Sequence, residues 1–188
     1  MIWQSLPARN LDRGELQTLV DGLANEPDRW REHIAFEGAQ RHYVSLHRDE
    51  YVDVWLLCWV PGDDTGWHDH DISSGAVRVV RGAVRESNPR IGGDPAVRIV
   101  AEGGSFSFGP EHIHRLAGED ELAVSIHAYS PPLWRLGQYS IDDDGVMRRA
   151  SVSYADELRP LEGSLAAQQG SLAAQAESLA ARHGSLAA

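Results

Sequence analysis

The chain has 188 residues, 42% of them hydrophobic, and this size and composition suit one globular domain that buries its own core. The formal net charge of −11 argues against a nucleic-acid partner, because the surface would repel phosphates. One cysteine excludes an internal disulfide framework, and without a signal-peptide pattern or about 20 consecutive apolar residues the chain is expected to be cytoplasmic, with no membrane contact.

Helical signals come first along the chain. Apolar residues recur at helical spacing within residues 15–23, and either Asp12 or Asn10 is available as the N-terminal cap. Pro27 is typical of the first turn of a helix and predicts a second, short helix that carries Trp30. The sequence therefore predicts an N-terminal helical segment over residues 1–40.

From about residue 42 the pattern changes to short strands rich in β-branched and aromatic residues, separated by clusters of Gly, Pro and Asp. The stretch 88–94 is typical of a loop between strands. The clearest strands cover residues 42–47, 52–60, 75–86, 97–101, 104–108 and 122–129. Many closely spaced strands predict a mainly β domain, a barrel or sandwich, over residues 41–160.

The tail over residues 161–188 repeats Gly-Ser-Leu-Ala-Ala almost regularly, which places a leucine at every seventh position from Leu165. A leucine heptad could indicate a helix that docks on a partner. Ala and Gly fill the neighbouring positions, however, so the seam is weak. This composition favours a low-complexity tail without a catalytic role.

Two histidines, His68 and His70, are separated by one residue in a segment that we expect to be a strand, so their side chains share a face. Such a pair can be structural, but it can also hold a metal if a third ligand is near. His114 and His112 both follow a later predicted strand and compete for that role. Neutral imidazole suits iron, zinc, copper and nickel, so the ligand type alone does not identify the metal.

The spacing around these histidines resembles the first motif of the cupin superfamily: Gly, five residues, His-x-His, three or four residues, Glu, six residues, Gly. Here five residues separate Gly62 from His68, and six residues separate Gly75 from Gly82. Gly75 occupies the place where most cupins have a metal-binding Glu. The resemblance therefore implies a jelly-roll-like cupin β-barrel whose metal site has no carboxylate ligand.

The second cupin motif also has a counterpart, in which Gly104 and Pro110 precede His114. The segment His114-Arg115-Leu116 is similar to His-Arg-Val of the cysteine dioxygenase (thiol dioxygenase) family. This resemblance selects His114 over His112, so that His68, His70 and His114 form the expected metal site. An all-histidine site is, among cupins, the mark of that family, which implies Fe(II) as the metal.

A third segment, 125–132, is similar to Ser-x-His-x-Tyr-Ser-Pro-Pro of the same family, in its bacterial form. Alternation along a strand puts Ser125, His127 and Tyr129 on one face, which suits a hydrogen-bond relay. The resemblance implies that Tyr129 lies beside the metal, held by His127 and Ser125, and that the bond before Pro131 is cis.

Some animal members link this tyrosine to a cysteine by a thioether. The corresponding residue here is Gly75, so the link cannot form. The cysteine of this chain, Cys58, lies in an apolar strand and is expected to be a small buried residue.

Substrate recognition departs from the family pattern, in which an arginine in a Tyr-x-Arg context binds the carboxylate of cysteine. The matching segment here is Tyr43-Val44-Ser45. Arg41 has the strand parity of Tyr43 and could reach inward, whereas Arg48 has the opposite parity unless a bulge intervenes. We therefore expect Tyr43 and Arg41 to bind substrate, because a guanidinium is the best carboxylate partner.

These features together predict an Fe(II)-dependent thiol dioxygenase that uses O2 to convert a small thiol, L-cysteine first, to its sulfinic acid, as in cysteine catabolism. Another small thiol such as 3-mercaptopropionate is an alternative substrate. A cupin acting on a non-thiol substrate, or a non-enzymatic metal-binding cupin that serves as a sensor or storage protein, is an alternative function. We expect a monomer or a weak homo-oligomer.

Overall fold

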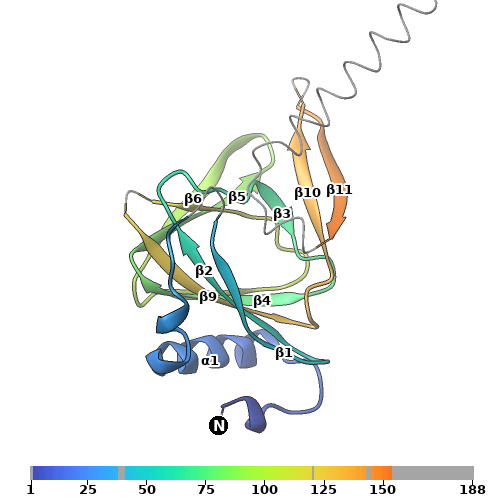
Figure 1. Cartoon of the computed structure of the whole chain (residues 1–188). Helices are drawn as coiled ribbons and strands as arrows, with labels where there is room; N and C mark the ends of the chain where they lie inside the picture. The colour runs from blue at the N-terminus through green and yellow to red at the C-terminus, as the bar shows by residue number, and fades with distance from the viewer. Residues whose placement is uncertain (1, 38–40, 120, 143–144, 154–188) are drawn as a thin grey trace, which may run out of the picture.

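The computed structural model describes residues 2–37, 41–119, 121–142 and 145–153. The tail predicted for residues 161–188, and the end of the β domain predicted at residue 160, lie outside these ranges. Within them the expected mainly β fold class is confirmed, since the strands follow the N-terminal helices (Figure 1). In this part of the chain no helix has both the length and the apolar character needed to cross a membrane.

The helix predicted at residues 15–23 is confirmed as α1, Arg13–Ala24. Asp12 is the cap: its side chain accepts a hydrogen bond from the Glu15 amide while the Glu15 side chain accepts one from the Asp12 amide, so two otherwise unpaired N–H groups are satisfied. The apolar face of α1 packs against β4, β9 and β7 and covers the outside of the main sheet (Figure 1).

Short 3₁₀ turns flank this helix: η1 (Ile2–Ser5), η2 (Pro27–Arg29) and η3 (Arg31–His33). Pro27 does begin a short helical turn, but Trp30 follows it as the C-terminal cap. The buried Trp30 ring donates its Nε1–H to the Leu23 carbonyl at 2.9 Å, which ties the turn to the end of α1.

Eleven strands in the described residues form three sheets, ordered β1-β2-β9-β4-β7, β11-β10-β3 and β6-β5-β8. The strands are β1 (Tyr43–Arg48), β2 (Asp53–Trp59), β3 (Trp67–Asp69), β4 (Ser74–Arg81), β5 (Ala83–Arg90), β6 (Gly93–Ala101), β7 (Ser105–Phe108), β8 (Arg115–Gly118), β9 (Ala123–Ser130), β10 (Arg135–Ile141) and β11 (Met147–Ser153). One apolar cluster lies between the main sheet and α1, and a second, around Trp59, Phe108 and Leu136, fills the interior of the barrel.

Two expectations about strands were wrong. The strand predicted over residues 75–86 is two strands, because Gly82 has φ 68° and its position lies against the Leu122 carbonyl, where only glycine fits. The predicted loop 88–94 is mostly strand: Arg90 pairs with Gly93, so β5 and β6 form a hairpin with a tight turn. Neither Pro89 nor Pro95 is among the paired residues. Proline has no N–H to donate to a neighbouring strand, so it is compatible with a strand at such positions.

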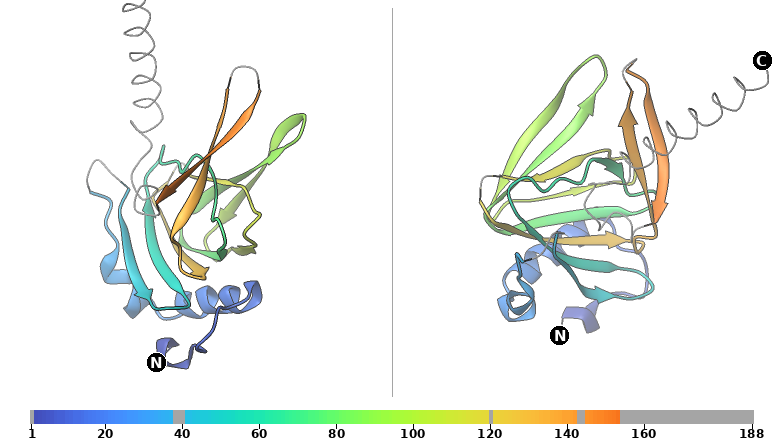
Figure 2. Two further views of the ribbon diagram at one scale, coloured as in Figure 1. Left: turned by 90° about the vertical axis from the view of Figure 1, so that its right-hand side faces the viewer. Right: turned by 45° about the horizontal axis from the view of Figure 1, so that its top comes forward.

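The hairpins β5–β6 and β10–β11 both project from the same side of the barrel (Figure 2). The short strand β3 pairs with β10 through Trp67, His68 and Asp69. It therefore lies at the inner edge of the second hairpin, between that hairpin and the segment that carries His114.

Candidate metal centre

The three predicted histidine ligands lie together inside the barrel. His68 is on β3, His70 follows that strand directly, and His114 precedes β8. The backbones of His68 and His114 exchange two hydrogen bonds, of 2.9 and 3.0 Å, which fixes their side chains next to each other. The ring centroids are 4.7 to 5.1 Å apart, and each residue is at most 2% exposed.

Hydrogen bonds to two of the rings set which nitrogen faces the centre. The Nδ1–H of His68 donates to the Gly66 carbonyl at 3.1 Å, and the Nδ1–H of His114 donates to the Glu86 carboxylate at 2.9 Å. A carbonyl and a carboxylate only accept, so each Nδ1 carries the proton and each Nε2 keeps its lone pair. This is the second-shell arrangement that orients histidine ligands of metals.

The centre has unsatisfied nitrogen atoms that suit a metal ion. Among the described residues, the buried Nε2 of His114 and both ring nitrogens of His70 have no hydrogen-bond partner. Burial, reinforced by neighbouring histidines, lowers the pKa of His70 well below its ordinary value, and burial lowers the pKa of His114 to about 3. Ligand nitrogens of the three residues lie within 4.8 Å of one another. Three imidazoles whose nitrogens lie this close together fit a divalent transition metal.

Glu86 on β5 is an acidic residue of this site that the sequence reading did not identify. It is fully buried, and its Oε1 accepts hydrogen bonds from His114 Nδ1 at 2.9 Å and from His112 Nε2 at 3.0 Å. Burial opposes ionisation, but the hydrogen bonds from His112 and His114 and the charge of Arg98 hold the pKa of Glu86 below its ordinary value.

His112 thus lies beside the centre as a partner of Glu86. Glu86, His112 and His114 are also close enough to hold an ion of their own, but the guanidinium of Arg98 pairs with Glu86 there. A guanidinium repels a cation, so this group is better described as the outer hydrogen-bond shell of His114.

Asp69, between the two ligands on β3, points to the opposite side of the strand and anchors it. It accepts hydrogen bonds from Arg149 at 2.7 and 2.9 Å, from the Tyr139 hydroxyl at 2.6 Å and from the Gly137 amide at 3.0 Å. Despite burial, these donors keep the pKa of Asp69 below its ordinary value. The His-x-His strand is therefore fastened to β10 and β11.

Gly75, which the sequence comparison placed at the position of the usual cupin glutamate, lies in a tightly packed part of the main sheet. Gly75 pairs with Phe108 on one side and with Tyr129 on the other. A Cβ at Gly75 would overlap the Phe108 ring and approach Tyr129 Cδ1 to 3.1 Å. The Phe108 ring packs against His70, with centroids 4.7 Å apart, and so fills the space beside the centre.

Ser125, His127 and Tyr129 form a continuous hydrogen-bonded row on β9. Ser125 Oγ lies 2.7 Å from His127 Nε2, and His127 Nδ1 lies 3.2 Å from the Tyr129 hydroxyl. Burial lowers the pKa of His127 well below its ordinary value, so the ring is neutral. The Tyr129 ring stacks on His70 at 5.1 Å, which brings the row to the histidine centre. The bond before Pro131 is cis, as expected.

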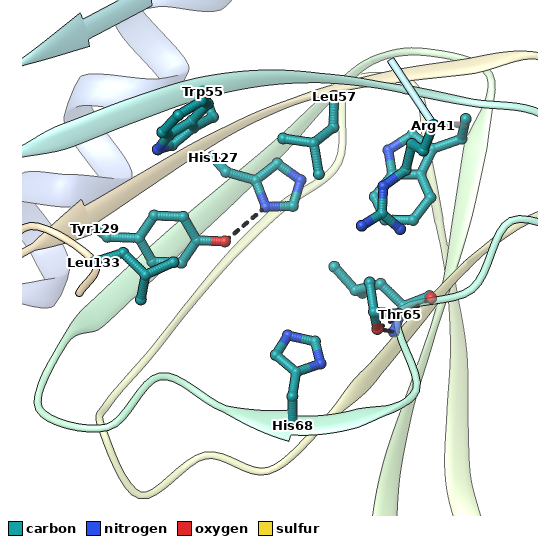
Figure 3. Close-up of a pocket in the computed structure, with 10 residues that line it drawn as sticks. Arg41, Trp55, Leu57, Thr65, His68, His127, Tyr129 and Leu133 are labelled. Atoms are coloured by element: carbon teal, nitrogen blue, oxygen red, sulfur yellow. Dashed lines mark hydrogen bonds between the residues drawn. The ribbon is translucent and has the colours of Figure 1, made fainter. Parts of the chain in front are cut away.

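A small cavity, in which about 20 Å³ is open to the centres of water molecules, lies between this row and His68. Figure 3 shows Tyr129, His127, Arg41 and His68 around this common space. The cavity is lined by Arg41, Trp55, Leu57, Trp59, Thr65, His68, Leu116, His127, Tyr129 and Leu133.

The two other residues considered for substrate binding lie elsewhere. The Tyr43 ring contacts Trp55 edge-on at 5.8 Å and is not among the lining residues, so it supports the cavity wall. A bulge in β1 does intervene between Ser45 and His47, but Arg48 pairs with Asp53 at 2.6 Å and stacks over Trp134. Arg41 is the guanidinium that lines the cavity.

Cys58 is buried, as expected, and burial raises the pKa of its thiol. It lies in the apolar cluster between the main sheet and α1, away from the histidine centre.

Comparison with known proteins gives one family. The chain matches the family model for cysteine dioxygenase type I over residues 2–142. It is 26% identical to cysteine dioxygenase type 1 of Danio rerio over 132 residues, and 24% identical to that of Homo sapiens over 133 residues. Each alignment covers 63% of this chain and just under two thirds of the relative, 65% and 64% respectively.

Solved structures show a more distant likeness. A Klebsiella pneumoniae protein with a double-stranded β-helix domain is 12% identical, with a TM-score of 0.47 over 64% of this chain and 92% of that one. A cupin superfamily protein of Desulfitobacterium hafniense is also 12% identical, with a TM-score of 0.46 over 54% of this chain and 87% of that one.

Proposed function

Because the chain belongs to the cysteine dioxygenase type I family, we propose that it is an Fe(II)-dependent thiol dioxygenase. The reaction joins a thiol R–SH and O2 into the sulfinic acid R–SO2H, so both oxygen atoms end on sulfur and no other reductant is needed. The observation that carries the proposal is the buried cluster of three histidines, which contains no carboxylate among the described residues and lies next to a hydrogen-bonded tyrosine that lines the adjoining cavity.

His68, His70 and His114 would hold the metal. Iron in this site would supply the chemistry with O2 and would lower the pKa of a coordinating thiol. Because the three ligands are neutral, the site keeps the full charge of the ion, and it therefore favours an anionic partner such as a thiolate.

Tyr129 is the proton-bearing group nearest to the centre on the β9 side. Its ring lies against His70, and its hydroxyl is held by His127, which is held in turn by Ser125. In this position the hydroxyl would orient the reacting thiol and the oxygen atoms that pass to sulfur by a hydrogen bond. His127 is neutral and buried, so its part is to position Tyr129.

Arg41 would bind the substrate carboxylate. Hydrogen bonding between Cys58 and His42 continues the β1–β2 pairing, which places Arg41 beside Trp59, whereas Ser45 pairs with Trp55. Four residues along a strand span about 13 Å, so this guanidinium enters from the opposite end of the cavity to the family position at Ser45.

The cavity favours a thiol carboxylate as substrate. Among the described residues, its lining contains Arg41 and no acidic side chain. A carboxylate is matched by the guanidinium, whereas cysteamine, which has no carboxylate, offers the guanidinium no opposite charge. We propose L-cysteine as the first candidate, with 3-mercaptopropionate as the alternative.

The test is O2 uptake by metal-free protein loaded anaerobically with Fe(II), using L-cysteine, 3-mercaptopropionate and cysteamine in parallel, with the sulfinate product quantified. Uptake with a thiol carboxylate and not with cysteamine is expected, at one O2 per sulfinate. Absence of uptake with all three thiols, at one bound iron per chain, would overturn the proposal.

A further inference from the structure

Trp59 is a fully buried side chain at the end of β2 that lines the cavity. Its indole makes two different polar contacts. The ring nitrogen lies 2.8 Å from Ser125 Oγ, and the ring face lies under the guanidinium of Arg41, whose carbon is 4.7 Å from the ring centroid. One rigid side chain thus contacts both the row on β9 and the cation at the other end of the cavity.

The indole nitrogen gives the row on β9 a direction. An indole N–H only donates, so Ser125 Oγ accepts from Trp59. The other described partner of Ser125 is His127 Nε2, so the Ser125 proton is satisfied if the hydroxyl donates to that nitrogen. The reverse direction would leave a buried hydroxyl proton without a described partner.

This direction also determines which ring nitrogen of His127 carries the proton. Burial keeps this ring neutral, so it carries one proton, and an Nε2 that accepts from Ser125 places that proton on Nδ1. Nδ1–H therefore donates to the Tyr129 oxygen, and the Tyr129 proton is directed to an acceptor other than His127. The direction Trp59 to Ser125 to His127 to Tyr129 makes the tyrosine hydroxyl a donor.

The indole face holds the other contact. A guanidinium stacked on an indole is attracted by the ring, and the stacking itself does not cover the edge along which the N–H groups point. Arg41 is 6% exposed and lines the same cavity as Tyr129, as Figure 3 shows. An anion that attracts Arg41 would therefore act on the face of the Trp59 indole. The N–H of the same indole begins the hydrogen-bonded row on β9.

We propose that Trp59 is a positioning residue that couples the two ends of the cavity: the indole face holds Arg41 for the substrate anion, and the indole N–H sets Tyr129 as a hydrogen-bond donor. The kinetic meaning of this inference rests on the proposed function. The hydrogen bonds and the stacking do not depend on it.

The kinetic test separates the two contacts. Trp59→Phe keeps an aromatic face and removes the N–H, so kcat for 3-mercaptopropionate should fall about tenfold while KM stays within about twofold. Arg41→Met should do the opposite and raise KM about tenfold with a smaller effect on kcat. Trp134→Phe, at a 65% exposed tryptophan, is the matched control and should change neither.

A second measurement is independent of activity. In Zn(II)-loaded, ¹⁵N-labelled protein, Trp59→Phe identifies the indole resonance of Trp59. Ser125→Ala should shift that resonance, and Ser125→Thr, which keeps a hydroxyl, should largely restore it. Addition of 3-mercaptopropionate should move the resonance in the unaltered protein and not in Arg41→Met.

An indole resonance that ignores Ser125→Ala, or a Trp59→Phe enzyme as active as Trp134→Phe, would overturn the coupling. If Trp59→Phe does not fold, Ser125→Ala decides the kinetic half, since it must lower kcat, leave KM unchanged and be rescued by Ser125→Thr. If no thiol supports O2 uptake while the resonance still responds to Ser125→Ala and to the thiol, the proposed function fails and the coupling stands.

Discussion

The two ends of the cavity are built from different parts of the fold. At the metal end, His68 and His114 are bonded to each other through their backbones, and Asp69 fastens the ligand strand to β10 and β11. At the other end, Arg41 precedes β1, the outermost strand of the main sheet, and packs on the face of Trp59.

Under the proposed function, this difference separates the residues that would hold the metal from the residue that would select the substrate. A ligand set that is held from several strands tolerates little change, whereas the edge of a sheet tolerates substitution and displacement. The family arginine can therefore be absent at Ser45, and a guanidinium can enter from Arg41, without a change at the histidines. The predictions below test whether substitutions near the three histidines have large effects and whether a substitution at Arg41 has a small one.

His70→Ala should have the largest effect. The His70 ring offers nitrogens that lack any described partner, so its loss should reduce iron from about one per chain to background and abolish thiol-dependent O2 uptake. Metal analysis after gel filtration measures this. His33→Ala, at a histidine away from the cavity, should retain iron, and iron retained in His70→Ala would refute the ligand assignment.

Glu86→Gln should weaken metal binding by about 10- to 100-fold, because removal of a carboxylate behind a histidine ligand disturbs its orientation and basicity. Competition with a chelator of known affinity gives the value. Glu102→Gln, at an exposed glutamate, is the control. Equal affinity for both variants would mean that Glu86 has no influence on His114.

Gly75→Ala should lower the free energy of unfolding by about 1–3 kcal/mol, since the new methyl group would overlap the Phe108 ring. Urea denaturation of the two proteins provides the comparison. Gly93→Ala, where no atom lies within 4 Å of the added carbon, should be nearly neutral. A neutral Gly75→Ala would show that the metal end has more room than its packing indicates.

Arg41→Met should have the smallest effect and alter selectivity alone: kcat/KM for 3-mercaptopropionate falls about tenfold, while the rate with cysteamine, which has no carboxylate, and the iron content do not change. A loss of iron in this variant would break the proposed separation between the two ends.

Part of this site could be predicted from the sequence, because it depends on the spacing of residues within a single strand or helix. His68 lies on β3 and His70 follows it two residues later, Ser125, His127 and Tyr129 alternate on β9, and α1 begins at the cap residue Asp12. Each of these expectations needed only the period of a single element and its flanking residues.

The remaining features depend on pairings between distant segments. Glu86 reaches His114 because β5 pairs with β8, a strand that the sequence pattern did not reveal. Trp59 contacts Ser125 across the β2–β9 pair, and Gly92, with φ 71°, lies in the turn that joins β5 to β6. None of these contacts follows from the periodicity of one strand.

Arg149 stabilises the ligand strand from outside the segment that matches the family. The family match stops at residue 142, yet the guanidinium that grips Asp69 comes from β11, beyond that limit. A chain cut at the end of the match would keep all three histidines and the contacts of Asp69 with Gly137 and Tyr139, but it would lose the Arg149 guanidinium. The set of residues that fastens the ligand strand therefore extends beyond the segment by which the family is recognised.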